Sequence, residues 1–266
     1  MDWKEWGIGK IVDLIWEFFV GKKQSTLSNK TGKKIIDVIK NEKGEDTILV
    51  KSPKCDFNSN SVLFVMPGEE AIFINNGKIV GKFNEGRYRL NTSNYPFLSD
   101  LITLISGERV FASNIYFVRK SVSCPVDWGT SLQVRDPVQR ISTRVMCRGV
   151  YRIQISNSES FLKYYIGNGT ETINQFEFAQ LLKDEILQTI KSKLISYIFE
   201  SDEEIIGIGR KQTALAEEIR KDIEDVYKEY GFKIVSFHIS GMEVLSDNRR
   251  EKIEDAYSQK RVNEIN

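Results

Sequence analysis

The chain has 266 residues, with 38 lysines and arginines against 37 aspartates and glutamates, so its formal net charge is +1. This near-zero charge argues against a protein that works by neutralising nucleic-acid phosphates, and we expect no nucleic-acid partner. The composition, 41% hydrophobic and 11% aromatic, excludes a disordered chain, because a protein of this size buries a core without disulfides or metals. The sequence predicts a globular protein of one large or two modest domains.

The cysteine and histidine content excludes several kinds of enzyme. Cys55, Cys124 and Cys147 are widely spaced and odd in number, so they indicate neither a disulfide framework nor a CxxC metal pair. His238 is the only histidine. The motifs HExxH, GxSxG and GxxxxGK[ST], which hold zinc, an activated serine or a nucleotide phosphate, do not occur. We therefore expect no metal site, no cofactor and no histidine- or cysteine-dependent catalysis, while catalysis by carboxylates alone stays open at this point.

Residues 1–22 are predicted to form an amphipathic helix with a broad apolar face. Lys10, Asp13 and Glu17 recur at three- and four-residue spacing and mark its polar stripe. The apolar run is too short for a membrane span, which needs roughly 20 apolar residues. Three of the four tryptophans lie in this helix, which is typical of a helix at a membrane interface. The residues expected to contact a membrane or a partner are Trp3, Trp6, Ile8, Ile11, Leu14, Ile15, Phe18 and Phe19.

The apolar face of this helix could also contact something other than a membrane. It can dock on a partner subunit, or it can pack against the core of the same chain. Residues 23–34 follow as a polar, basic linker. Lysines in such a linker gain about 1 kcal/mol each beside an anionic bilayer, although a solvated linker without a partner has the same composition.

From residue 35 to 156 the hydrophobic period is two, which predicts a sheet-rich region of antiparallel strands. The turn signals are Pro67-Gly68 and Asn75-Asn76-Gly77-Lys78, and the second is typical of a type I′ hairpin. The expected strands are Thr47–Lys51, Val62–Met66, Ala71–Ile74, Gly86–Leu90, Ile115–Val118 and Arg140–Ile155.

From residue 157 to 245 the pattern is mainly helical. The expected elements are a short helix from Ser158 that ends near Gly167, a long helix Thr170–Phe199, a helix that begins at a Ser201–Glu204 capping box and ends at Gly231, and a strand Phe232–Ile239. Residues 246–266 then begin a charged helix with sparse apolar positions. We expect this helix to continue in a longer parent protein as a coiled coil, or to pair with a neighbouring subunit.

Four arginines recur at every fourth position of the longest expected strand. Arg140, Arg144, Arg148 and Arg152 would share one face, because even spacing places side chains on the same side of a strand. The opposite face, which includes Val145, would line the core. The arginines fit either a solvated face paired with cross-strand acids or a docking surface for an acidic helix or a lipid headgroup.

The balanced net charge is the sum of two opposite halves. Residues 1–150 carry 22 basic and 16 acidic side chains, a net +6, whereas residues 151–266 carry 16 basic and 21 acidic ones, a net −5. A positive sheet half and a negative helical half can meet within one molecule or head to tail between molecules. Contacts of the second kind build rings or filaments.

Several segments resemble, in this order, a known family. They are Leu63–Phe73, Asn76-Gly77-Lys78, Phe83–Tyr88, Asn94–Phe97, Tyr116-Phe117-Val118 and Trp128-Gly129-Thr130. Over about residues 35–245 the chain resembles the bacterial SPFH (band 7) proteins, in the branch called virion-core-protein-like, which is distantly related to stomatin, prohibitin and flotillin. The strand after the acidic helix, followed by a charged helix, also resembles the end of an SPFH domain and the start of its coiled coil.

The resemblance implies an α+β domain in which a twisted antiparallel sheet system is followed by packed helices. It implies a membrane-associated oligomeric scaffold that recruits other proteins and has no catalytic residues. In this branch the membrane is reached without a transmembrane span, which agrees with the amphipathic helix at residues 1–22.

We therefore expect a peripheral scaffold in a bacterial cytoplasm, at the inner face of the cell membrane, with itself, membrane proteins and anionic lipid as partners. One alternative is a soluble adaptor whose N-terminal helix docks on a protein partner without touching lipid. Another is an enzyme that acts through carboxylates in a cleft.

Overall fold

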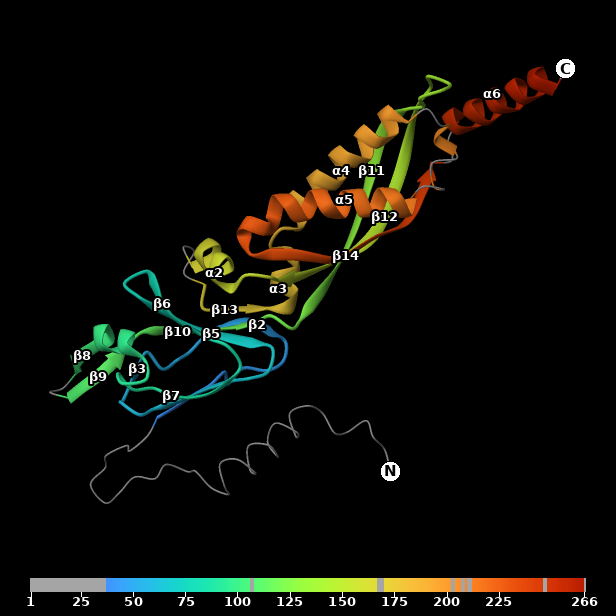
Figure 1. The fold of residues 1–266 in the computed structure, drawn as a ribbon. Coiled ribbons are helices and arrows are strands. Elements are labelled where there is room, and N and C mark those ends of the chain that lie inside the picture. Colours follow the sequence, from blue (N-terminus) through green and yellow to red (C-terminus); the bar gives the residue numbers. More distant parts are fainter. Residues whose placement is uncertain are drawn as a thin grey trace, which may run out of the picture.

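The computed structural model describes residues 37–105, 108–166, 170–201, 204–206, 209, 212–245 and 248–265. The predicted helix 1–22 and linker 23–34 lie outside these residues, so they stay predictions. The described part is elongated: a β-rich end is followed by a long three-stranded sheet covered by helices, and the last helix lies beyond the far end of that sheet (Figure 1).

The β-rich end contains the strands β1 to β10 and forms three small sheets together with β13. The strands are β1 (Val38–Ile39), β2 (Thr47–Lys51), β3 (Asp56–Phe57), β4 (Val62–Val65), β5 (Glu69–Asn75), β6 (Lys78–Phe83), β7 (Gly86–Arg89), β8 (Ile102–Ile105), β9 (Glu108–Ala112) and β10 (Asn114–Arg119), with a 3-10 helix η2 (Pro96–Leu101). The sheet orders are β1-β4-β7, β13-β2-β10-β5-β6 and β3-β9-β8. The predicted strands of this region are confirmed, and β1–β4 is a parallel pair.

Both predicted turns of the β-rich end are present. Asn76 and Gly77 have φ values of 48° and 74° and join β5 to β6, as a type I′ hairpin requires. Gly68 has a φ of 76° in the reversal between β4 and β5. Phe73 and Phe83 pack in the core beneath these turns, with ring centroids 5.2 Å apart.

The long sheet is made of β11 (Ser123–Arg135), β12 (Ser142–Ile155) and β14 (Phe232–Val244), all antiparallel, with β12 in the centre. Helices α4 (Lys183–Glu200) and α5 (Gln212–Tyr227) lie against one face of it, α4 over β11 and α5 over β14 (Figure 1). Their buried residues, among them Ile190, Leu194, Ile219 and Ile223, form one core with the sheet.

The remaining elements lie between the two regions or, for η4 and α6, next to the ends of β14. They are α2 (Ser158–Ile166), β13 (Thr172–Asn174), α3 (Gln175–Gln180), the 3-10 helix η4 (Lys228–Tyr230) and α6 (Asn248–Ile265). The stop at Gly231 is confirmed: this residue adopts a left-handed conformation, and a Cβ there would lie 2.3 Å from the carbonyl oxygen of Asn157.

The predicted single helix Thr170–Phe199 is wrong. The residues expected to form its first turn form the strand β13 instead, which pairs with β2. The rest is divided into two separate helices, α3 and α4. Asn174 starts α3 through a capping box, because its side chain accepts from Glu177 N–H while Glu177 Oε2 accepts from Asn174 N–H. Pairing with β2 thus outweighs the helical period of Ile173 and its neighbours.

The predicted helix start at Ser201 is also wrong, because α5 begins at Gln212. Ser201 has an extended conformation and ends α4. Ile205, which follows, is buried against the sheet, and its N–H donates to the carboxylate of Asp136 at 3.1 Å. A tertiary hydrogen bond therefore takes the N–H that a helix capped at Ser201 would have donated to the Ser201 carbonyl oxygen.

Candidate docking surfaces

One face of the β11–β12–β14 sheet is open to solvent, and we call it the open face. Along β12, exposed and buried residues alternate: Arg144, Met146 and Arg148 are exposed, whereas Val145 and Cys147 are buried. This confirms the predicted division of the strand. Helices α4 and α5 lie against the other, covered face (Figure 1).

Three of the four arginines of the predicted row lie on the open face. Arg144, Arg148 and Arg152 belong to β12, but Arg140 does not, because the strand begins at Ser142. Arg140 lies in the turn between β11 and β12 with a φ of 60°. The expected strand from Arg140 is therefore wrong at its start, and the basic row contains three members.

Contacts within the chain engage these guanidinium groups only weakly. Arg148 lies 3.7 Å from Glu243 Oε1, and both side chains are more than two-thirds exposed, so water screens the pair. Arg152 donates to the carbonyl and hydroxyl oxygens of Ser123, both at 3.3 Å. Each bond is long for a charged donor, so a partner can replace it at low cost.

The open face carries an excess of positive charge around an apolar centre. Its exposed basic residues are Arg135, Arg144, Arg148, Arg152 and Lys233, and its exposed acids are Asp127 and Glu243, which leaves a net +3. Met146 lies in the basic row and is 50% exposed. His238 is also exposed and pairs in register with Val150.

The covered face makes the sheet rigid. Trp128, Phe237 and Tyr151, one from each strand, stack with ring centroids 5.4 and 6.4 Å apart and nearly parallel planes. The stack needs Gly149, where a Cβ would lie 2.8 Å from the Trp128 ring and 1.9 Å from the carbonyl oxygen of His238. Only glycine lets the strands and the indole approach this closely.

The outer surface of α4 and α5, which we call the helix layer, has the opposite charge. Its exposed charged residues are Asp184, Glu185, Glu200, Glu217, Glu218, Asp225 and Lys221. The other basic groups of this surface, Lys183, Lys191, Lys193 and Arg220, are partly buried. Lys193 pairs with Asp222 at 2.8 Å, and Arg220 pairs with Glu217 and Glu224 at 2.8 and 2.6 Å. Phe199 and Ile195, one turn apart on α4, are 81% and 45% exposed.

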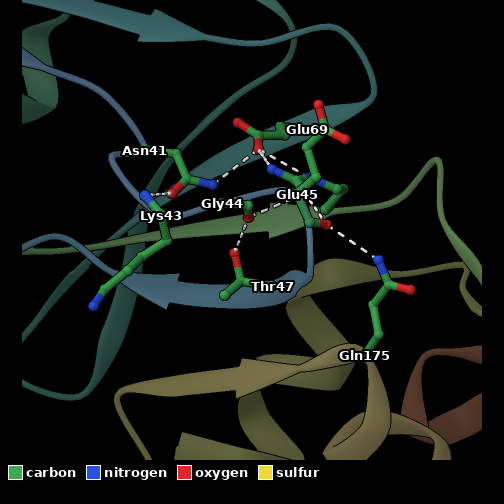
Figure 2. A network of polar contacts seen from close by, with 8 residues as sticks. Asn41, Lys43, Gly44, Glu45, Thr47, Glu69 and Gln175 are labelled. Carbon is green, nitrogen blue, oxygen red and sulfur yellow. Dashed lines mark hydrogen bonds and ion pairs between the residues drawn. The ribbon is translucent and has the colours of Figure 1, made fainter. Parts of the chain in front are cut away.

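A polar network ties the loop before β2 to the strands around it (Figure 2). Glu69 Oε1 accepts from Asn41 Nδ2 at 2.9 Å and from Arg119 Nη2 at 3.0 Å. The Arg119 guanidinium also donates to the carbonyl oxygen of Glu45. Gln175 Nε2 donates to the same oxygen at 3.1 Å. Because Gln175 begins α3, the network joins the β-rich end to the helical part.

Glu70 makes a second connection on the other side of β5. Its carboxylate accepts from Lys120 Nζ at 2.9 Å and from Ser158 Oγ of α2 at 2.6 Å. Burial raises the pKa of Glu70, but the bonds from Ser158 and Lys120 outweigh it and leave the pKa below its ordinary 4.5. This stabilisation is present above that ordinary value and is lost as the pH falls through the lowered pKa.

Asp136 links the end of the β11–β12 hairpin to α6. Its Oδ1 accepts from the N–H groups of Val138 and Gln139, at 2.9 and 2.6 Å. Its Oδ2 accepts from Ile205 N–H and from the Tyr257 hydroxyl, both at 3.1 Å. Burial beside this carboxylate raises the pKa of Tyr257, so the hydroxyl stays a donor at neutral pH.

Two grooves bear on the alternative of a carboxylate enzyme. The first, of about 520 Å³, is lined by Lys40, Lys43 and Lys51 together with Glu42 and Glu171, and Lys51 Nζ contacts Glu171 at 3.1 Å. The second, of about 310 Å³, is mainly apolar, and its one acid is Glu243. These grooves give no reason to propose acid–base catalysis by a carboxylate pair.

Sequence reasoning missed most of the open face outside β12. Strand β11 was not expected, although Cys124, Val126, Trp128, Leu132 and Val134 alternate with polar residues and give the same signal as β12. The acids of the helix layer contribute to the negative half of the chain, but their exposure depends on how α4 and α5 pack. Phe199 lies one residue beyond Ile198, the last member of the buried row of α4, so its position off that row was the sequence signal of its exposure.

The residues predicted to contact a membrane, from Trp3 to Phe19, lie outside the described part of the chain. Among the helices within the described ranges, none is long and apolar enough to cross a membrane.

The sequence matches a known protein family and is similar to one protein of Bacillus subtilis. The SPFH domain-Band 7 family matches residues 55–261. The protein YdjI of Bacillus subtilis (strain 168), described as uncharacterized, is 23% identical over 206 residues, which cover 73% of this chain and 61% of YdjI. Members of the family are commonly membrane-associated scaffold proteins. Because the match covers most of the chain and the fold is of the expected α+β class, the protein belongs to the SPFH domain-Band 7 family.

Proposed function

We propose that the protein is a peripheral membrane scaffold that forms homo-oligomers and recruits membrane proteins. The observation that carries this proposal is the open face, a basic sheet surface that no helix among the described residues covers, on a domain of a scaffold family. A sheet face that no helix of its own domain covers is suited to binding a macromolecule. The charged helix α6 is a second contact between copies, because few of its residues are buried.

Membrane attachment is assigned to residues 1–22. Their sequence supports this role, since tryptophans and a broad apolar face favour a helix that lies in the interface of a bilayer. The basic linker 23–34 would favour anionic lipid, and the inner face of the cell membrane is the proposed location. The finer placement in the virion-core-protein-like branch belongs to the same proposal.

Liposome flotation of the full chain tests this assignment. Vesicles with and without anionic lipid are compared for the full chain and for residues 23–266. A matched pair of double variants places the same number of changes on each side of the helix: Phe18→Asp with Phe19→Asp on the apolar face, and Asp13→Asn with Glu17→Gln on the polar stripe. We expect the full chain and the polar-stripe variant to float and the other two to stay in the dense fraction.

Equal flotation of the full chain and residues 23–266, or no flotation of either, would contradict the lipid role. In that case the alternative of a soluble adaptor, whose N-terminal helix docks on a protein partner, would be favoured.

A further inference from the structure

We propose that copies of this protein join through two different surfaces, the open face of one copy and the helix layer of the next. This inference rests on the proposed scaffold function and names the contact that would build the oligomer. It is carried by the opposite charge, matching length and exposed apolar residues of these two surfaces.

The charges of the two surfaces are complementary. The open face carries five basic and two acidic side chains, a net +3, whereas α4 and α5 together carry eight acidic and five basic side chains, a net −3. Two open faces would repel one another, and so would two helix layers. Opposite surfaces attract, and such complementarity favours both encounter and correct register.

The lengths over which the charges are spread also match. Arg144 and Arg152 are eight residues apart on β12, which is about 26 Å in a strand. Asp184 and Glu200 are 16 residues apart on α4, which is about 24 Å in a helix. Because α4 and α5 run along the sheet, one helix layer can lie along the whole basic row (Figure 1).

Each surface has an exposed apolar group near its charges. On the open face, Met146 lies between Arg144 and Arg148. On the helix layer, Phe199 and Ile195 are exposed one turn apart. On the helix layer these apolar residues lie at the C-terminal end of α4, and a large exposed aromatic side chain is a typical anchor of a protein interface.

The position of the two surfaces determines the kind of assembly. The open face and the helix layer lie on opposite sides of the same layered unit, so a contact between them leaves one unused surface at each end of the pair. Such a heterologous contact repeats, and it gives a ring when the rotation between copies closes and a filament when it does not.

Charge reversal on each surface tests the inference. The sheet variant carries Arg144→Glu and Arg152→Glu, and the helix variant carries Glu218→Lys and Asp225→Lys, which lie two turns apart on α5. All four positions are exposed. A control variant carries Lys78→Glu and Arg89→Glu, which are exposed at the β-rich end and change the net charge as much as the sheet variant. Sedimentation velocity of the full chains, over a range of concentrations, measures assembly.

We expect the wild type and the control to form large species at low salt and smaller ones at high salt, because salt screens charged contacts. In the sheet variant the open face becomes net −1 and faces a helix layer of net −3, and in the helix variant the helix layer becomes net +1 and faces an open face of net +3. Each variant alone should therefore lose at least tenfold in association constant. A mixture of the two variants restores both attractive pairs, and we expect it to assemble like the wild type. Restored assembly also shows that each variant is folded.

Three results would overturn the inference: a wild type that stays monomeric at low salt, variants that assemble like the wild type, or a mixture that fails to assemble although both variants melt cooperatively. These results are separate from the lipid assay. If the sheet variant floats with vesicles and also assembles normally, the scaffold proposal stands and only this contact is excluded.

Discussion

The two faces of the β11–β12–β14 sheet are made from neighbouring residues of the same strands, yet they have opposite properties. Tyr151 is 1% exposed and stacks in the core, while the next residue, Arg152, is exposed and bonds only loosely to Ser123. The covered face is fixed by packing that tolerates no change in volume. Among the described residues, the arginines of the β12 row on the open face make only long or water-screened contacts, which leaves them available to another molecule.

The largest expected difference in stability between a change on the covered face and a change on the open face is on β11. Trp128→Ala removes the indole from the stack with Phe237 and leaves a cavity, so we expect a loss of about 3–5 kcal/mol in the free energy of unfolding. Asp127→Ala, one residue away on the open face, should change it by no more than about 0.5 kcal/mol. Urea denaturation measures both, and equal losses would contradict the division between the faces.

A smaller difference in stability is expected between alanine substitutions at Gly149 and Gly129. Gly149→Ala inserts a Cβ 1.9 Å from the carbonyl oxygen of His238, so the sheet must shift, at an expected cost of about 1–3 kcal/mol. The matched change Gly129→Ala meets its nearest atom, the carbonyl oxygen of Cys147, at 3.8 Å and should cost almost nothing. Thermal unfolding followed by circular dichroism compares them. A destabilised Gly129 variant would mean that the open face is closed in solution.

The smallest change in stability is expected at the end of the sheet, where α6 is attached. Tyr257→Phe removes one hydrogen bond to Asp136 and should lower the free energy of unfolding by about 1 kcal/mol. The first turns of α6 should then exchange amide hydrogens faster, while β12 stays protected. Ser258→Ala is the matched control, because its hydroxyl bonds only within α6, to the carbonyl oxygen of Glu254. Unchanged exchange in the Tyr257 variant would show that packing of Ile253 alone holds the helix.

Much of this fold was accessible from sequence because local rules determine it. The hairpin at Asn76-Gly77 and the stop at Gly231 follow from backbone conformations that few residues adopt, and the two faces of β12 follow from simple alternation. The wrong predictions occur where contacts with residues distant in the sequence determine the local structure. Residues 172–174 form the strand β13 because they pair with β2. Helix α5 begins after the predicted start, because the N–H of Ile205 donates to Asp136 instead of to a helical carbonyl.

The candidate surfaces were predictable only in part, for a related reason. The arginine row is visible because a strand has a fixed period, and the charge difference between the halves of the chain is visible by counting. The exposure of Phe199 and of the acids on α4 and α5 depends on which side of each helix packs on the sheet. The four-residue period of Ile186, Ile190, Leu194 and Ile198 predicts which side of α4 is buried, but the sequence alone does not show which sheet face that side covers.

The attachment of α6 has a mechanical consequence. Ile253 is fully buried near the base of this 18-residue helix, and Tyr257 holds it to Asp136 at the end of the sheet. The eight residues beyond Tyr257 are about 12 Å long and act as a lever arm: a tilt of roughly 10° at Tyr257 moves the far end by roughly 2 Å. A small twist of the sheet, produced by whatever binds the open face, would thus be magnified into a displacement at the tip of α6.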